Sequence, residues 1–234
     1  FISIYFIIAS GDLPISVFRT SDLQQLRNFK NSQDKLAIVE RKPLEGADAF
    51  FKELMSLNIK LIGQVSKIKG IEDIKEILKE DITKKLQDNY FYDIWVSDMA
   101  QICEVFCETI DSNAVGFCLT TKRGCRRYHI DNVPMRLLVT YSGEGTEWIR
   151  DEAIDHEVII NGSTNEKIIK YPSKRQFMNT WDVAIFNGGS KGLLHRTPDK
   201  ALNTSSALLR LDHPSFWYNI LKEQVNNSHQ SIEL

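Results

Sequence analysis

Val115-Gly-Phe-Cys-Leu-Thr120 marks the point where the hydrophobic pattern of this chain changes its period. Before it, apolar residues recur at the spacing of amphipathic helices, and after it short apolar runs follow one another between turn residues. The expected strands are Val115–Thr120, Tyr128–Asp131, Arg136–Tyr141, Thr146–Ile149, Glu157–Ile160, Lys167–Tyr171, Asp182–Phe186, Leu193–Arg196 and Ala207–Leu211. Asn161-Gly162 predicts a hairpin within this series. Eight or nine short strands are typical of a jelly roll, which manages its sheet edges by pairing two sheets.

The first half of the chain is expected to be mainly helical. Ile71, Ile74, Leu78, Ile82 and Leu86 recur at helical spacing, with lysines and acids on the opposite face. The pattern also predicts helices over 22–29, 47–57 and 98–110 and a strand over 35–40. We therefore predict an α+β fold in a single domain, 1–234. In it a mainly helical buttress (1–112) packs on a jelly-roll core or double-stranded β-helix (113–215), followed by a C-terminal helix and tail (216–234).

Composition limits the classes of function. The 234 residues are 42% hydrophobic and 26% charged with a formal net charge of -2, so nothing in the overall charge predicts binding to nucleic acid or to a membrane. Four cysteines without a CxxC pair indicate reduced thiols and a cytoplasmic protein. The apolar first ten residues are too short to span a bilayer, and form either a buried strand or the remnant of a signal segment. The amphipathic helical half could form the face of a homodimer.

Arg127-Tyr-His-Ile-Asp131 is the first candidate for chemistry. His129 and Asp131 stand two residues apart on an expected strand and so project to the same face. His195, which follows a Gly-Gly turn, would complete a site of two histidines and one carboxylate, which binds Fe(II) and leaves positions open. On an inward face such a pair is costly to bury without a partner or a metal, whereas on an outward face it is merely solvated. The sequence does not decide between the two faces.

Arg210 is an arginine in the middle of the apolar strand Ala207–Leu211. A buried guanidinium requires a carboxylate. That carboxylate either belongs to a bound organic acid, which arginine holds with two parallel hydrogen bonds, or to the protein, for example Asp212. We favour the bound acid and keep the internal salt bridge as the alternative.

These residues lie in segments that resemble the core of the Fe(II)/2-oxoglutarate-dependent oxygenases, most closely its prolyl-hydroxylase-like branch. The segments are His129-x-Asp131, Arg136–Tyr141, Gly143-Glu-Gly-Thr-Glu-Trp148, Asp182–Phe186, His195 and Arg210. From Cys125 to Asp212 the chain also resembles a bacterial domain of unknown function (DUF1826-like), with Cys-x-x-x-His-x-Asp-Asn and Thr-Tyr-x-Gly-x-Gly-Thr-x-Trp. That second resemblance is closer and implies no activity.

The oxygenase resemblance implies a hydroxylase acting on a small molecule or a peptide. His129, Asp131 and His195 would bind Fe(II), and 2-oxoglutarate would be the co-substrate. Its far carboxylate would pair with Arg210, helped by a hydroxyl group of Tyr141 or Thr146. In the prolyl-hydroxylase branch a lysine stands nearer the distal histidine, at an offset that falls here on Ser205, so Arg196 and Lys200 are lesser candidates.

Other readings of the same residues stay open. Arg126 and Arg127, just ahead of the metal motif, either belong to a solvated loop or attract an anionic substrate. A cupin-like jelly roll with another metal and another reaction is possible on the same architecture. No His-x-His pair of the cupin kind is present in the sequence. A non-enzymatic binding module, in which the His-x-Asp pair is incidental, and a peptide-binding member of the oxygenase superfamily that has lost turnover are further alternatives.

Overall fold

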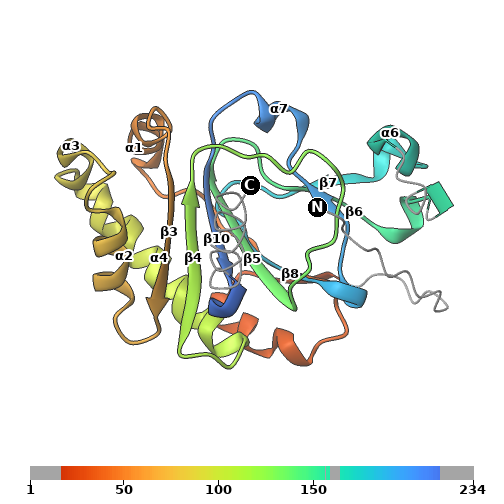
Figure 1. The fold of residues 1–234 in the computed structure, drawn as a ribbon, viewed down its shortest axis with the longest axis horizontal. Coiled ribbons are helices and arrows are strands. Elements are labelled where there is room, and N and C mark those ends of the chain that lie inside the picture. Colours follow the sequence, from red (N-terminus) through yellow and green to blue (C-terminus); the bar gives the residue numbers. More distant parts are fainter. Residues whose placement is uncertain (1–16, 156, 159–163, 217–234) are drawn as a thin grey trace, which may run out of the picture.

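The computed structural model describes residues 17–155, 157–158 and 164–216 (Figure 1). The strands are β1 (Val17–Thr20), β2 (Leu36–Val39), β3 (Lys60–Ser66), β4 (Ala114–Thr120), β5 (Met135–Ser142), β6 (Glu147–Ile149), β7 (Arg175–Phe177), β8 (Val183–Asn187), β9 (His195–Arg196) and β10 (Ala207–Asp212). The α-helices are α1 (Ala47–Leu54), α2 (Gly70–Leu78), α3 (Lys84–Gln87), α4 (Tyr90–Thr109), α6 (Asn165–Ile168) and α7 (Asp199–Leu202). Short 3-10 helices are η1 (Leu23–Asn31), η2 (Asp151–Ala153), η3 (Pro172–Lys174) and η4 (Gly189–Lys191).

Two sheets of unequal size organise the described part of the chain. The large sheet has the strand order β1-β2-β8-β5-β10-β4-β3, and the small sheet has the order β7-β6-β9. β1 and β2 are parallel, and the other neighbours in the large sheet pair antiparallel. Figure 1 shows the longer helices gathered beside the large sheet and the small sheet lying away from them. The chain thus combines helices with a large sheet, as the predicted α+β class requires.

Alternation along the central strands separates two buried layers. On β10, Leu209 and Leu211 belong to the core that includes residues of α1, α2 and α4, whereas Leu208 belongs to a second cluster with Trp148 of the small sheet. Successive residues of a strand point to opposite faces, so Arg210 faces the small sheet together with Leu208. This alternation places the arginine between the two sheets.

The N-terminal half departs from the predicted helical buttress. Its strands β1, β2 and β3 join the large sheet, and of these only β2 is predicted by the pattern. Gly63 lies on the inner face between buried Leu61 and Val65, and apolar Ile62 lies on the exposed face, so the alternating strand signal is weak there. The helix expected around 71–86 is divided into α2 and α3, and α4 starts earlier than predicted.

Three expected strands of the C-terminal half differ as well. At 128–131 only one isolated bridge forms, between His129 and His195. Most of 167–171 follows the short helix α6, and residues 157–158 are helical, while the rest of 157–160 and the hairpin at Asn161-Gly162 lie outside the described residues. The tail beyond residue 216 also lies outside them. Among the described residues, no helix combines the length and the apolar character needed to cross a membrane.

Cysteine exposure gives a first testable prediction. Cys103, Cys107 and Cys118 are buried, whereas Cys125 is exposed. Burial raises the pKa of Cys107 to about 11 and also raises the pKa of Cys103 and Cys118, so these thiols stay protonated near neutral pH. We expect iodoacetamide to alkylate Cys125 in the folded protein and the other three only after unfolding, as measured by peptide mass spectrometry. Fast alkylation of Cys103 in the folded protein would contradict this packing.

Candidate metal centre

His129, Asp131 and His195 come together between the two sheets. One ligand atom from each lies within 4.8 Å of the others. The two histidines face each other through reciprocal backbone hydrogen bonds of 3.1 Å, and their ring centroids are 4.6 Å apart. His195 begins β9, whereas His129 and Asp131 belong to an irregular segment, so a single pair of main-chain hydrogen bonds fixes the distance between the histidines.

The backbone also fixes which nitrogen of each histidine faces the centre. Nδ1 of His129 lies 2.9 Å from the carbonyl oxygen of Arg127, and Nδ1 of His195 lies 2.9 Å from that of Leu193. Because a carbonyl oxygen only accepts hydrogen bonds, each Nδ1 must carry the proton and donate it. The Nε2 atoms then point to Asp131, at 3.6 Å from Oδ1 for His129 and 3.2 Å from Oδ2 for His195. In neutral histidines, both Nε2 lone pairs are therefore directed at a carboxylate.

Main-chain contacts hold Asp131 in place. The amide of Gly189 donates to the carbonyl oxygen of Asp131 at 2.9 Å. A Cβ at Gly188 would lie 2.5 Å from the same oxygen and 1.9 Å from the carbonyl oxygen of Val133, so position 188 has no room for a side chain. The Gly188-Gly189 turn after β8 thus determines how closely residues 131–133 can approach the large sheet.

The electrostatic surroundings keep Asp131 ionised. Burial alone would raise the pKa of this carboxyl group, but the neighbouring His195, His129 and Arg136 together hold that pKa well below its usual range. Arg136 forms an ion pair with Oδ1 of Asp131. Oδ2 of Asp131 is buried and accepts no hydrogen bond from the described residues, although Nε2 of His195 lies 3.2 Å away. A buried acceptor facing a nitrogen lone pair is the arrangement that a metal cation satisfies.

Two arginines and one acid extend the centre along the sheet. Nε of Arg136 donates to Oδ1 of Asp212 at 2.7 Å, and Nε of Arg210 donates to Oδ2 of the same carboxylate at 2.6 Å. Asp212 is fully buried. Both guanidinium groups also lie over the ring of Phe216, at 5.2 Å for Arg136 and 4.8 Å for Arg210. The internal partner that the sequence offers for Arg210 is therefore present, and Arg136 is a site residue that the sequence reasoning missed.

Tyr141 does not lie at the centre. It stands an odd number of positions after Arg136 on β5, so its side chain faces the helices. Its ring stacks on Phe51 with centroids 5.5 Å apart, and its hydroxyl group donates to Asp98 Oδ2 at 2.7 Å. The predicted role of Tyr141 beside the co-substrate is thus contradicted by its position, because the large sheet separates it from His129.

Of the other predicted residues, Thr146, Lys200 and Ser205 lie toward the other end of the large sheet, near the loops that follow β4 and β5. Thr146 accepts a hydrogen bond of 2.8 Å from Arg123. Arg126 and Arg127 are exposed, and the contact of Arg127 with the site is made by its carbonyl oxygen. Ser205 and Lys200 are exposed near the start of β10.

Arg196 instead belongs to a buried network on the outer side of the small sheet. It donates to Glu147 and to Asp199, and Glu147 also accepts from the hydroxyl group of Tyr128. Burial and the Glu147 carboxylate raise the pKa of Tyr128, which stays a donor. Since Tyr128 precedes His129 and Arg196 follows His195, this network ties together the two segments that carry the histidines.

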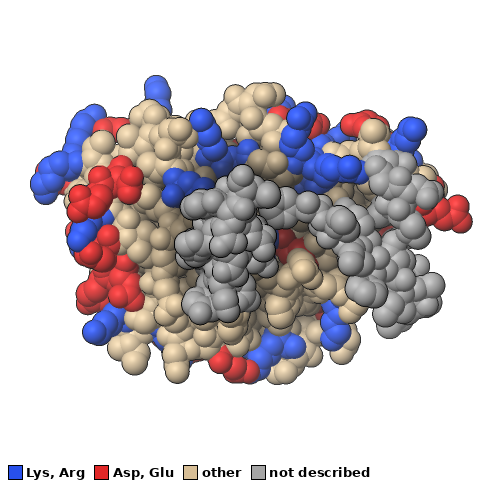
Figure 2. Space-filling model, viewed as in Figure 1, with Lys and Arg blue, Asp and Glu red and all other residues tan. Residues whose placement is uncertain are grey.

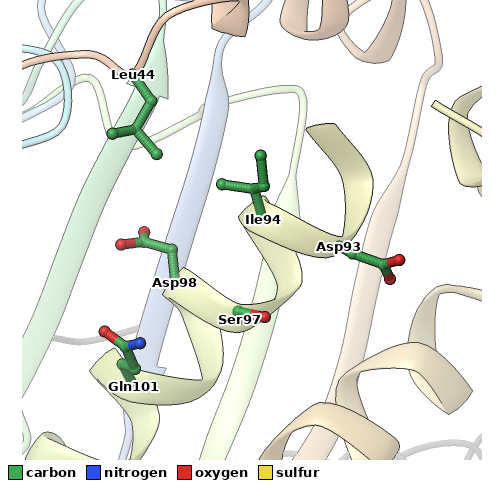
Figure 3. A pocket seen from close by; sticks show the side chains of 6 residues that line it. All are labelled: Leu44, Asp93, Ile94, Ser97, Asp98 and Gln101. Atoms are coloured by element: carbon green, nitrogen blue, oxygen red, sulfur yellow. The ribbon is translucent and has the colours of Figure 1, made fainter. Parts of the chain in front are cut away.

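A pocket of about 470 Å³ lies elsewhere in the described structure, on the outer face of α4 (Figure 3). Its lining residues are Leu44, Asp93, Ile94, Ser97, Asp98 and Gln101. Asp98 is held there by Arg41, whose Nη1 lies 2.5 Å from Oδ1. None of the three metal-centre residues lines this pocket, which is on the helix side of the large sheet.

Comparison with solved structures gives remote likenesses. The dioxygenase for auxin oxidation (DAO) in rice is 8% identical, with 85% of this chain and 82% of that chain covered and a TM-score of 0.46. A putative oxygenase from Shewanella oneidensis is 10% identical, with 91% and 99% covered and a TM-score of 0.44. The Fe(II)/(alpha)ketoglutarate-dependent dioxygenase TqaL is 9% identical, with 81% and 86% covered and a TM-score of 0.43.

Sequence comparison places the chain in a family. A search of curated proteins found no match. The sequence model described as "Protein of unknown function (DUF1826)" matches residues 20–212, a range that contains the metal centre and both arginines. The match covers most of the chain and confirms the closer of the two resemblances. This protein therefore belongs to the DUF1826 family.

Proposed function

We propose that this protein is a non-haem Fe(II)/2-oxoglutarate-dependent oxygenase of the hydroxylase type. The observation that carries the proposal is the convergence of two Nε2 atoms and one carboxylate, with both Nδ1 atoms committed to backbone carbonyl groups. Two histidines and one carboxylate form the facial set that binds Fe(II) while leaving positions for co-substrate and oxygen. We propose a small molecule or a peptide as its substrate.

The strand order supports a jelly-roll core. From β4 onward the chain alternates between the sheets: β4 lies in the large sheet, the His129 bridge joins the small one, and β5 returns to the large one. β6 and β7 then lie in the small sheet, β8 in the large, β9 in the small and β10 in the large. This alternation is expected for a double-stranded β-helix. The metal centre would then lie between its two sheets.

Charge balance supports a dianionic co-substrate. Asp131 and Asp212 carry two negative charges and Arg136 and Arg210 two positive charges, so the described cluster is balanced as it stands. A divalent cation would add two positive charges to this enclosed region, and a dicarboxylate such as 2-oxoglutarate would offset them. Arg210 is suited to hold the far carboxylate, since its guanidinium group is fixed by Asp212 and Phe216.

The groups divide the tasks of such a reaction. His129, Asp131 and His195 would hold the cation, which when bound supplies oxygen activation and the oxidative decarboxylation of the 2-oxo acid. Arg136 keeps Asp131 ionised and oriented through its ion pair. Phe186 and Leu193 are fully buried beside His195 and would keep bulk water from the centre.

An anaerobic titration with Fe(II) and 2-oxoglutarate tests the proposal. We expect the wild type to develop a saturable visible charge-transfer absorption band when both are present. His129→Ala should lose metal binding and the band, whereas Arg210→Ala should bind Fe(II) and require at least about tenfold more 2-oxoglutarate. Tyr141→Phe is the matched control, because this hydroxyl group lies on the far face of the sheet.

The possible outcomes separate the alternatives. Iron that binds through His129 without any response to 2-oxoglutarate would refute the co-substrate and favour a metal-binding jelly roll with another reaction. Absence of iron binding in the wild type would refute the oxygenase and favour a binding module. A rise in the 2-oxoglutarate requirement of Tyr141→Phe equal to that of Arg210→Ala would contradict the placement of both residues.

A further inference from the structure

Arg123 is a largely buried cation without an acidic partner among the described residues. Its Nη1 donates to the backbone oxygen of Glu144 at 2.7 Å, and its Nη2 donates to the hydroxyl oxygen of Thr146 at 2.8 Å. Both acceptors are neutral, and its Nε is buried without a hydrogen bond to any described residue. Burial lowers the pKa of Arg123 to about 10, because the charged form loses contact with water and gains no nearby carboxylate in the described structure. Arg136 and Arg210, in contrast, share a carboxylate.

This arginine lies at the end of the large sheet opposite the metal centre. β4 and β5 run in the same direction, because each pairs antiparallel with β10. Arg136 stands at the beginning of β5, whereas Arg123 follows the end of β4 and bonds to Glu144 after the end of β5. The six residue steps of β5 from Arg136 to Ser142 span about 20 Å along the strand. The two arginines therefore serve different regions.

A cavity of about 200 Å³ opens beside Arg123. Its lining residues are Lys122, Arg123, Leu202, Asn203, Thr204 and Ser205. Two cations, an amide and two hydroxyl groups make it rich in hydrogen-bond donors, and none of the lining residues is an acid. Glu144 is nearby, but its carboxylate pairs with Lys200 at 3.9 Å. Figure 2 shows lysine and arginine side chains gathered along the upper edge of this face, where Figure 1 places the end of β4.

We propose that this cavity binds a phosphate group, with Arg123 as its main anchor and Lys122 as its second cation. Two cations suit a dianion, and the N–H groups of a guanidinium, of which Arg123 commits one on each terminal nitrogen, match tetrahedral oxygens together with the neighbouring hydroxyl groups. The volume admits free phosphate or the phosphate end of a larger molecule, and is below the range of pockets that enclose a whole drug-sized ligand. The site is distinct from the metal centre and independent of the oxygenase proposal.

Thermal unfolding with inorganic phosphate tests this site. Phosphate is compared with chloride at equal ionic strength, with a chelator present so that the metal centre plays no part. We expect phosphate at ten times its dissociation constant to raise the Tm of the wild type by about 3–6 °C. Arg123→Met should abolish this rise without lowering the Tm in chloride, because it removes a poorly compensated buried charge.

Control variants make the result specific. Arg19→Met removes an exposed arginine from β1, five strands away from β4 in the large sheet, and should keep the full rise. Lys122→Met, at an exposed position, should reduce the rise in Tm. This variant tests the site if Arg123→Met does not fold. No rise in the wild type, or equal rises in the wild type and Lys122→Met, would overturn the proposal.

Further ligands identify what the site takes. A phosphate monoester that gives a larger rise than free phosphate, again through Arg123, would support a site for a phosphorylated molecule. Equal rises would support free phosphate. An Arg123-dependent rise with 2-oxoglutarate but not with phosphate would overturn the proposal, because it would make Arg123 a carboxylate ligand.

Discussion

Asp131→Asn is expected to lose the stabilisation that a divalent metal gives the wild type. A metal at 100 times its dissociation constant should raise the Tm of the wild type by about 5–11 °C, because it binds the folded state only. The amide removes the anionic ligand between the two histidines and leaves Nε2 of His129 and His195 without the carboxylate that they face. The measurement is thermal unfolding with Fe(II) under anaerobic conditions, or with a redox-inert divalent ion in air.

Asn132→Ala is the matched control for this experiment. Asn132 is the exposed neighbour of Asp131, so its removal should preserve the metal-dependent rise in Tm. A full rise in Asp131→Asn would show that the metal binds elsewhere and would remove the basis of the proposed centre. A rise lost equally in Asn132→Ala would show instead that the segment, rather than the carboxylate, determines binding.

Asp212→Asn is expected to cause the largest loss of stability. Asp212 is fully buried and its two oxygens accept from Arg136 and Arg210, so the amide leaves two enclosed guanidinium groups without their shared anion. Removing one partner of a buried ionic group costs about 3–5 kcal/mol, or about 6–20 °C in Tm for a chain of this size. Urea unfolding of the metal-free protein measures the free energy of unfolding directly.

Asp199→Asn provides the comparison for Asp212. Asp199 also pairs with an arginine, Arg196, but its side chain is 74% exposed. Exposed ion pairs contribute about 1 kcal/mol or less, so this variant should stay close to the wild type. The double variant Asp212→Asn with Arg210→Met should recover part of the loss, since Arg210 is removed together with the carboxylate that it binds. Equal losses for Asp199→Asn and Asp212→Asn would contradict the description of a buried cluster.

The metal residues were predictable because their signal is local. His129 and Asp131 stand two positions apart, and His195 follows a turn after a strongly apolar strand. Neither feature requires knowledge of the sheet order. What the sequence could not provide is the single backbone bridge between His129 and His195, since the expected strand over 128–131 has no regular ladder.

The buried arginines were predicted less completely than the metal residues. Arg136 carries the same signal as Arg210, an arginine inside an apolar strand, yet only Arg210 was predicted as a site residue. Tyr141 was assigned to the site although its odd offset from Arg136 puts it on the opposite face of β5. Arg123 cannot be told apart in the sequence from the basic residues near it. Its burial depends on the contact of the loop after β4 with the loop between β5 and β6. Such burial follows from tertiary packing and has no local signature.

The two histidines depend on the main chain in a way that affects how relatives of this protein should be searched. Each imidazole is oriented by the carbonyl group two residues before it, at Arg127 and Leu193, where no side-chain atom takes part. The orientation of the imidazoles should therefore not depend on the side chains at these two positions, while insertions or deletions between each acceptor and its histidine should abolish it. Distant members of the family are then recognised by the preserved spacing of the metal residues, and the residue types beside them are a poor guide.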